Sequence, residues 1–90
     1  MNVDELRWFV AVAERGRVTR AAEELHISQP ALSVAIQKLE EELKTQLFER
    51  GKSEITVTPV GERIVEQAHK VLEEAARIRD IAQAGRNQLA

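Results

Sequence analysis

The side chains best suited to recognising another molecule lie in one short stretch, HISQPALSVAIQKLE, from His26 to Glu40. It contains Ser and Gln, which donate and accept hydrogen bonds without carrying a charge. There is no Asp or Glu between Leu25 and Leu39, although the chain carries 15 acidic and 13 basic residues and a net charge of −2. A polar surface that is free of carboxylates suits a partner that is itself negatively charged.

Catalytic or metal chemistry is not indicated by the other residue types. Histidine occurs only at positions 26 and 69, aspartate only at positions 4 and 80, and cysteine is absent. None of them forms a spaced acid–base or metal-binding group, and there is no glycine-rich phosphate loop. We therefore expect no enzyme activity, no metal and no cofactor. We also expect a cytoplasmic protein without membrane contact, because the chain has no secretory segment and no apolar run of about 18 residues.

Two helices are predicted before this stretch. Apolar residues at helical spacing predict the first over residues 4–15, and Gly16 is placed to end it. A shorter second helix is expected from Arg20 to Leu25 or His26, with Thr19 as its N-cap.

The stretch itself predicts a third helix, from about Gln29 to Leu43. Ser28 is a suitable N-cap, and Pro30 falls in the first turn, where its missing N–H costs nothing. The link to the second helix is only about three residues long, so the two helices must cross steeply, as in a helix-turn-helix. The side that faces the core carries Leu32, Ile36, Leu39 and Leu43.

The opposite side of the third helix has the properties of a DNA-reading surface. Gln can hydrogen-bond an adenine edge with both groups of its amide, and Val34 or Ala31 can touch a thymine methyl group. The helix N-terminus and the Ser28 hydroxyl suit a phosphate. A carboxylate on this side would be repelled by the DNA backbone, which explains its absence. From the pattern alone, an ordinary solvated helix face remains the alternative.

The rest of the chain predicts a hairpin and one long helix. Phe48, Ile55 and Val57 are spaced for two strands around the turn GKSE, with Arg50 and Lys52 near the tip. Thr58 and Pro59 then begin a helix that runs to the end of the chain. We expect a head over residues 1–58 and a dimerisation helix over residues 59–90.

The long helix carries small and apolar residues at heptad spacing, which predicts a seam with a second copy of the chain. The alternative is a helix that covers its own head, and a neighbouring stripe of Val65, Leu72 and Ala76 is placed to do so. The predicted seam consists of Ile64, Ala68, Val71, Ala75, Ile78, Ala82, Gly85 and Leu89.

Several motifs together resemble the N-terminal DNA-binding domain of LysR-type transcriptional regulators. They are ELRWFVAVAE, TRAAEELHISQPALS, IQKLEEEL, LFER and TPVGE. The resemblance implies a mainly α fold: a winged helix-turn-helix of three helices and a two-stranded wing, then a long linker helix that pairs antiparallel in a homodimer. It also implies double-stranded promoter DNA as the partner, and a tetramer in a full-length protein that carries a sensing domain. Within the family, Val34 with TPVGERIVEQA and AQAGRNQLA is most similar to the peroxide-sensing OxyR branch.

The resemblance also assigns roles to residues. The positions that match base contacts are Gln29, Pro30, Ser33, Val34 and Gln37. Those that match or adjoin phosphate contacts are Thr19, Arg20, Ser28, Lys38, Arg50 and Lys52. Many family members carry Arg where this chain has Val34, and valine removes the contact that Arg can make with guanine or phosphate. A helical dimerisation or adaptor module without DNA binding is the alternative function.

Overall fold

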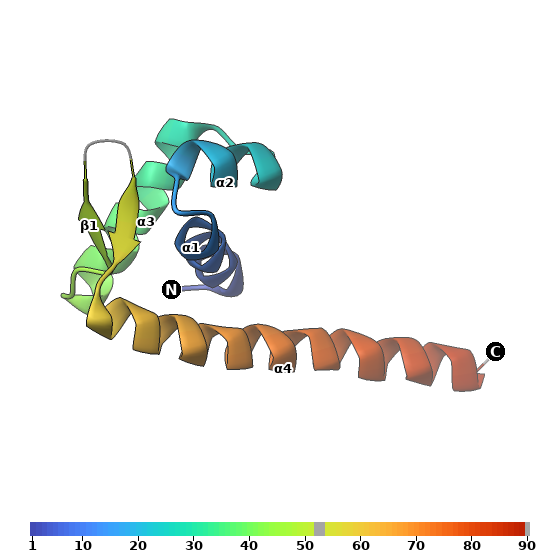
Figure 1. Cartoon of the computed structure of the whole chain (residues 1–90). Coiled ribbons are helices and arrows are strands. Elements are labelled where there is room, and N and C mark those ends of the chain that lie inside the picture. The colour runs from blue at the N-terminus through green and yellow to red at the C-terminus, as the bar shows by residue number, and fades with distance from the viewer. Residues whose placement is uncertain (52–53, 90) are drawn as a thin grey trace.

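A computed structural model describes residues 1–51 and 54–89, with side chains for residues 1–51 and 54–88. Three helices form a compact head, a two-stranded hairpin lies beside them, and a long helix passes under the head and projects beyond it (Figure 1). This is a winged helix-turn-helix followed by a long helix, as the sequence predicts. The elements in chain order are α1 (Val3–Arg15), α2 (Val18–Leu25), α3 (Gln29–Leu43), β1 (Phe48–Arg50), β2 (Ile55–Val57) and α4 (Pro59–Leu89).

The core of the head lies between α1, α2 and α3. Ala21 and Ala22 are buried on α2, and their small side chains let that helix approach its neighbours closely. The rings of Phe9 and Phe48 meet edge to face with centroids 5.4 Å apart, which joins the helices to the wing. The largest side chains with almost no exposed surface are Phe9, Val12, Leu32, Leu39 and Leu47.

The ends of the first and third helices follow the local signals in the sequence. Gly16 adopts a left-handed conformation with φ of 73°, and its N–H donates to the Val12 carbonyl at the end of α1. The Ser28 hydroxyl accepts the N–H of Ala31 at 3.2 Å, which caps α3. Only three residues separate the end of α2 at Leu25 from the start of α3 at Gln29, as in a helix-turn-helix.

The start of the second helix differs from the prediction. Helix α2 begins at Val18, its N-cap is Arg17, and no side chain caps it. Thr19 lies inside the first turn and is exposed, so its prediction as the N-cap was wrong. Val18 packs against the core, which draws the first turn of the helix further toward the N-terminus than propensity alone indicates.

The wing is a short antiparallel hairpin in which Phe48 pairs with Val57 and Arg50 with Ile55. Its second strand is tied to the head, because the N–H of Ile55 donates to the Gly16 carbonyl at 3.2 Å. The strand positions confirm the predicted hairpin. The predicted contact residue Lys52 lies outside the described residues.

The junction between wing and long helix is closely packed. The Thr58 hydroxyl accepts the N–H of Gly61 at 3.0 Å and donates to the Gln46 carbonyl at 2.8 Å. A Cβ atom at Gly61 would lie 2.5 Å from the Leu47 carbonyl oxygen, so only glycine fits there. The predicted start of the helix at Thr58 and Pro59 is therefore confirmed, and the junction fixes the direction in which α4 leaves the head.

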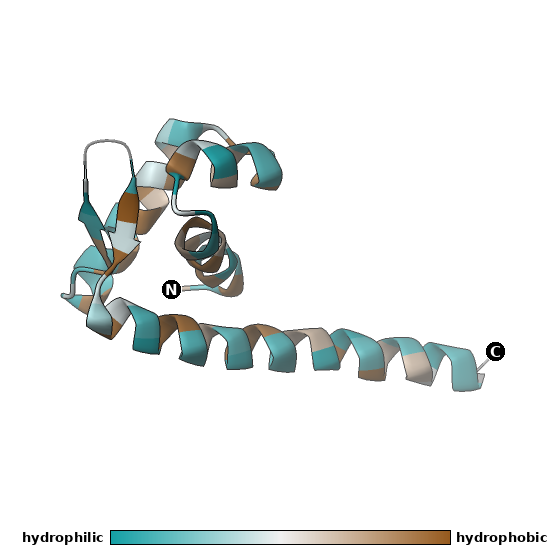
Figure 2. Ribbon diagram, in the orientation of Figure 1, coloured by the Kyte–Doolittle hydropathy of each residue, from teal (hydrophilic) through white to brown (hydrophobic). Residues whose placement is uncertain are grey.

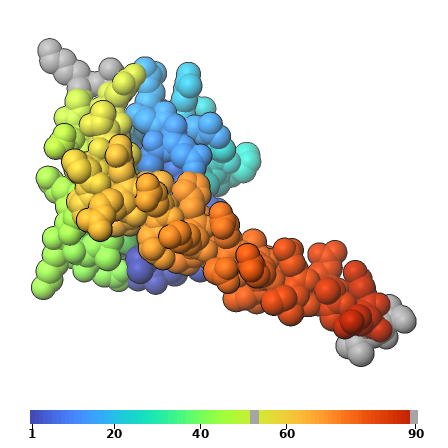
Figure 3. All heavy atoms as spheres, turned by 60° about the horizontal axis from the view of Figure 1, so that its bottom comes forward, coloured from blue at the N-terminus to red at the C-terminus, as the bar shows by residue number. Residues whose placement is uncertain are grey.

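The first half of α4 lies across α1 (Figures 1 and 3). Ala68 is 2% exposed in the core of its own head, so it has almost no surface left for a partner, and its prediction as an interface residue was wrong. Val65 and Leu72 pack against the head as predicted, whereas Ala76 is exposed and does not. The reason is that α4 moves away from the head along its length, so the head covers only the beginning of the stripe.

The second half of α4 projects into solvent, in a molecule that measures 55 × 25 × 19 Å. Apolar residues continue along this projecting half (Figure 2). Ile78 and Ile81 are 69% and 67% exposed there. Within the described ranges 1–51 and 54–89, no helix has the length and apolar character that a membrane span requires.

Candidate nucleic-acid interface

The polar face of α3 is open to solvent. Gln29, Pro30, Gln37 and Lys38 are exposed, and Val34 is 49% exposed between them. Ser33 is half-buried, so it offers less surface than the resemblance implies. The structure thus places most of the predicted base-contacting residues on one accessible face, and no carboxylate lies among them.

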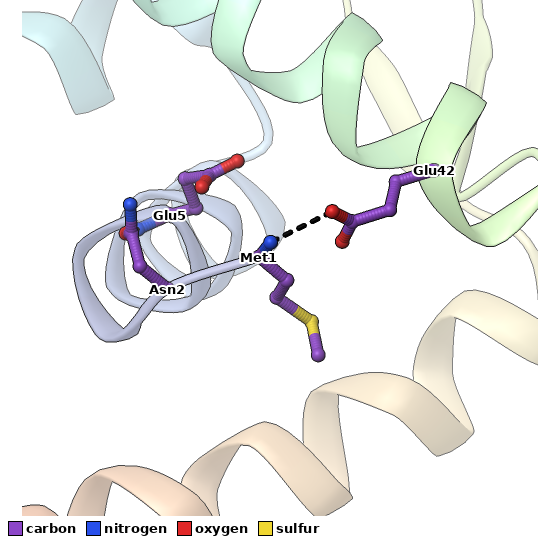
Figure 4. Close-up of polar contacts among 4 residues, drawn as sticks. All are labelled: Met1, Asn2, Glu5 and Glu42. Atoms are coloured by element: carbon purple, nitrogen blue, oxygen red, sulfur yellow. Dashed lines mark hydrogen bonds and ion pairs between the residues drawn. The ribbon is translucent and has the colours of Figure 1, made fainter.

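Two of the acidic residues that follow this face bind N–H groups elsewhere in the chain. The Glu40 carboxylate accepts the N–H groups of Leu47 and Phe48 at 2.8 and 3.3 Å. The Glu42 carboxylate binds the α-amino group of Met1 at 2.7 Å, beside Asn2 and Glu5 at the start of α1 (Figure 4). This hydrogen bond raises the pKa of the Met1 amine. These two carboxylates therefore support the head around the polar face of α3.

A depression on the wing side of α3 brings together residues that are far apart in the sequence. Thr19 from α2, Gln29 from α3 and Arg50 from β1 line the same hollow. Its other lining residues are Arg17, Val18, Gly51, Glu54 and Ile55. Predicted base and phosphate contacts therefore form one continuous surface here, while Arg20 lies apart, in a separate hollow with Arg15, Glu23 and Glu24.

Two helices begin at this depression. Val18 and Thr19 belong to the first turn of α2, and Gln29 begins α3. Neither first turn contains an acidic residue, and α2 has no side-chain cap. The partial positive charge at both helix starts is therefore not neutralised by a carboxylate within the first turn of either helix, which suits a phosphate group; the Glu54 carboxylate of the wing lines the same depression.

The arginines of the α1–α2 region differ in how strongly the protein holds them. The Arg15 guanidinium donates two hydrogen bonds to Glu24, at 2.6 and 2.8 Å. These bonds raise the pKa of Arg15 and lower that of Glu24. Arg17 instead makes one contact of 3.6 Å with Glu54. The sequence-based prediction of phosphate contacts did not include Arg17. It lies two residues before Thr19, which was included, and both residues line the same depression.

An apolar groove borders the other side of α3. Trp8 of α1 lines it together with Ala31, Val34 and Ala35 of α3. The other lining residues are Asn2, Glu5, Pro30 and Lys38. Val34 therefore belongs to an apolar strip that continues from the reading face toward α1. Within residues 1–51 and 54–89, no three His, Cys, Asp or Glu side chains are grouped as metal ligands.

The predicted dimer seam is only partly available in the single chain. Val71 and Ile78 are exposed, and Ala82 is exposed beside them. Ala75 is half-buried, and Ile64 packs partly against the head. The side chain of Leu89 lies outside the described residues. The exposed apolar surface is thus concentrated in the projecting half of α4, where Ile81 extends it beyond the predicted heptad positions.

Comparison with known proteins places these features in context. The family model described as bacterial regulatory helix-turn-helix protein, lysR family, matches residues 3–62. A hydrogen peroxide-inducible genes activator from Pectobacterium carotovorum subsp. carotovorum is 43% identical over 82 residues, covering 91% of this chain and 27% of that protein. The HTH-type transcriptional regulator TfdS from Cupriavidus pinatubonensis is 45% identical over 73 residues, covering 81% and 25%. The chain thus spans about a quarter of the length of these relatives.

Solved structures are similar over nearly the whole chain. A full-length OxyR variant from Pseudomonas aeruginosa is 57% identical with a TM-score of 0.93, covering 100% of this chain and 30% of that one. The complex of the CbnR DNA-binding domain with DNA is 39% identical with a TM-score of 0.89, covering 94% and 98%. The complex of the BenM DNA-binding domain with benA site 1 DNA is 42% identical with a TM-score of 0.88, covering 93% and 94%.

Proposed function

The chain belongs to the LysR family of bacterial regulatory helix-turn-helix proteins, and from this premise we propose that it binds double-stranded DNA sequence-specifically as the N-terminal domain of a transcriptional regulator. The observation that carries the proposal is the polar, carboxylate-free face of α3, which continues into the depression that contains Thr19 and Arg50. An enzyme function has no support, since the related proteins are named as regulators.

In this proposal α3 is the recognition helix and enters the major groove. Gln29 and Gln37 hydrogen-bond base edges, while Pro30 and Val34 provide apolar contacts. Ser33 contributes a smaller contact, because it is half-buried. The first turns of α3 are the part that fits the groove, since Glu41 and the residues after it would approach the backbone phosphates.

Phosphate contacts would surround the recognition helix. Thr19 and Arg50 are supported by their shared depression with Gln29. Ser28 and Lys38 are exposed beside the reading face, and Arg20 is exposed on α2. Lys52 remains a proposal from the resemblance alone. These contacts position the protein on the duplex without reading its sequence.

A homodimer through α4 would allow the protein to read two half-sites. One recognition helix covers only a few base pairs, which is too little to select a site in a genome. The exposed residues Val71, Ile78 and Ala82, with Ala75 beside them, are the supported part of the seam. We infer that residues 1–58 act as the DNA-binding head and residues 59–90 as the dimerisation helix.

We propose that the chain comes from a cytoplasmic regulator of the OxyR-like branch, which acts as a tetramer with a separate sensing domain. Its support is the similarity to hydrogen peroxide-inducible genes activators and to full-length OxyR. Binding to promoter DNA requires access to the bacterial chromosome, and this requirement supports the proposed cytoplasmic location.

Selection from random duplex DNA, followed by equilibrium binding to the selected site and to a scrambled duplex, tests the function. We expect binding to the selected site to be about 10³-fold tighter or more, and both affinities to fall with salt. A chain that dimerises but shows no salt-dependent binding to either duplex would instead be a dimerisation or adaptor module.

A further inference from the structure

The tip-side end of the wing approaches the connection between α1 and α2. The N–H of Ile55 donates to the Gly16 carbonyl at 3.2 Å, and Arg17 Nη2 lies 3.6 Å from Glu54 Oε1. The backbone bond holds the wing against the connection, so the two charged side chains remain close together. Both side chains are exposed, Arg17 by 48% and Glu54 by 66%.

Arg17 is held loosely compared with a neighbouring arginine. Arg15 donates two short hydrogen bonds to Glu24, which occupy one side of its planar guanidinium group. The separation of 3.6 Å between Arg17 and Glu54 is an ion-pair contact rather than a hydrogen bond. The guanidinium of Arg17 therefore retains donors that can bind a second anion.

Glu54 is the unfavourable charge in an otherwise basic hollow. Arg17 and Arg50 line this depression together with Glu54, and Thr19 adds a hydroxyl group. A DNA phosphate that approaches Arg50 must also approach the Glu54 carboxylate. Unlike Glu40 and Glu42, whose carboxylates bind backbone or terminal N–H groups, Glu54 directs its carboxylate toward Arg17.

We propose that Arg17 is a further phosphate-binding residue, and that Glu54 competes with the DNA backbone for it and so weakens binding to every DNA sequence. The ligand is a phosphodiester group of duplex DNA that enters the depression beside Arg50 and Thr19. The inference rests on the proposed DNA-binding function. In addition, Glu54 would limit the affinity of the protein for the DNA sugar–phosphate backbone, while the reading face of α3 stays unchanged.

The contribution of Arg17 is tested with Arg17→Gln, which removes the charge and keeps a polar side chain. Affinities for the selected and scrambled duplexes are measured over a range of salt concentrations. We expect weaker binding to both, and a slope of log affinity against log salt that is shallower by about 0.9. The control is Lys70→Gln, an equal charge change at an exposed position of α4 outside the depression; its slope should stay at the wild-type value.

The competing role of Glu54 is tested with Glu54→Gln. We expect about 2- to 5-fold tighter binding to both duplexes at low salt. Glu73→Gln makes the same change of net charge on the exposed surface of α4 and should have a clearly smaller effect. In the Arg17→Gln background the gain from Glu54→Gln should shrink, because only direct repulsion of the phosphate remains.

The opposite outcomes would overturn the inference in identifiable ways. An unchanged salt slope for Arg17→Gln removes Arg17 from the interface. Equal effects of Glu54→Gln and Glu73→Gln reduce the role of Glu54 to net charge, and an undiminished gain in the double variant excludes competition for Arg17. These results leave the proposed function standing, whereas a wild-type chain that binds neither duplex overturns both.

Discussion

The Glu40 carboxylate accepts the N–H of Leu47 at 2.8 Å, and this contact joins α3 to the residue that immediately precedes the wing. The same oxygen accepts the N–H of Phe48 at 3.3 Å. Leu47 has no exposed surface and Phe48 is buried, so their N–H groups cannot turn to water without opening the core. Glu40 therefore satisfies two backbone donors at the point where the chain leaves the helices and begins the wing.

Replacing Glu40 with Ala should destabilise the head. The N–H of Leu47 would remain buried without its acceptor, which costs about 1–3 kcal/mol. Urea or thermal unfolding measures the change, with Glu41→Ala as the control because Glu41 is exposed on the same helix. The Glu41 variant should stay within about 0.5 kcal/mol of wild type. Equal stability of the two variants would show that the Glu40 contact is dispensable.

Gly61→Ala should disrupt the junction between the wing and α4. The added Cβ would lie 2.5 Å from the Leu47 carbonyl oxygen and 2.7 Å from Val57 Cγ1, so the backbone must shift. We expect a loss of about 1–3 kcal/mol in the free energy of unfolding. Gly85→Ala is the matched control, since nothing lies within 4 Å of its Cβ position; alanine there should stabilise the helix by about 0.5–1 kcal/mol. A neutral Gly61 variant would contradict the close approach.

Gln29→Ala should remove a base contact. The side chain is exposed at the start of α3 and lines the depression near Arg50. We expect a loss of about 1–3 kcal/mol on the selected duplex and little change on scrambled DNA. Competition binding with both duplexes measures the difference. Equal losses on the two would mean that Gln29 positions the backbone and reads no base.

Val34 should read a thymine methyl group rather than a hydrogen-bonding edge. It is 49% exposed and continues into the apolar groove with Ala31 and Trp8. Replacing single thymines of the selected site with deoxyuridine removes only the methyl group. One such position should weaken binding of the wild type by about 1 kcal/mol, close to the value of one buried methylene, and have no effect on Val34→Ala. If uracil is tolerated at every position, Val34 reads no methyl group.

Ile78→Glu should separate the proposed dimer without harming the head. Ile78 is 69% exposed in the single chain, whereas Ala75 is half-buried and its replacement would also disturb the packing of α4. A carboxylate buried in the seam of each partner costs several kcal/mol. Sedimentation should show monomers with unchanged circular dichroism, and affinity should fall steeply for two half-sites but little for one. Lys70→Glu, exposed on the same helix, should remain dimeric.

Local signals in the sequence were sufficient for most element boundaries. Gly16, Ser28 and the pair Thr58–Pro59 mark helix ends through hydrogen bonds or dihedral preferences that involve residues within four positions of one another. Thr19 shows the limit of such signals. Its side chain is of a type that often caps helices, but α2 begins one residue earlier, at Val18, because Val18 packs against the core.

The polar face of α3 was also visible in the sequence, because helical periodicity alone determines which residues share a side. The residues that surround this face could not be predicted from the sequence. The depression joins Thr19, Gln29 and Arg50 from three elements, and the pairing of Arg17 with Glu54 spans the distance from the α1–α2 connection to the wing. No local preference encodes such contacts, since they depend on how the hairpin packs against the helices.

The long helix shows most clearly the difference between what the sequence determines and what only the tertiary structure decides. Heptad spacing by itself determined that one side of α4 is apolar along its whole length. It could not determine which part of that side packs against the head and which part stays exposed, because apolar residues of the same kinds occur in both parts. The tertiary structure decides this. The junction at Thr58 and Gly61 directs α4 across α1, so Ala68 is buried in its own head while Ile78 lies beyond the reach of the head and stays exposed.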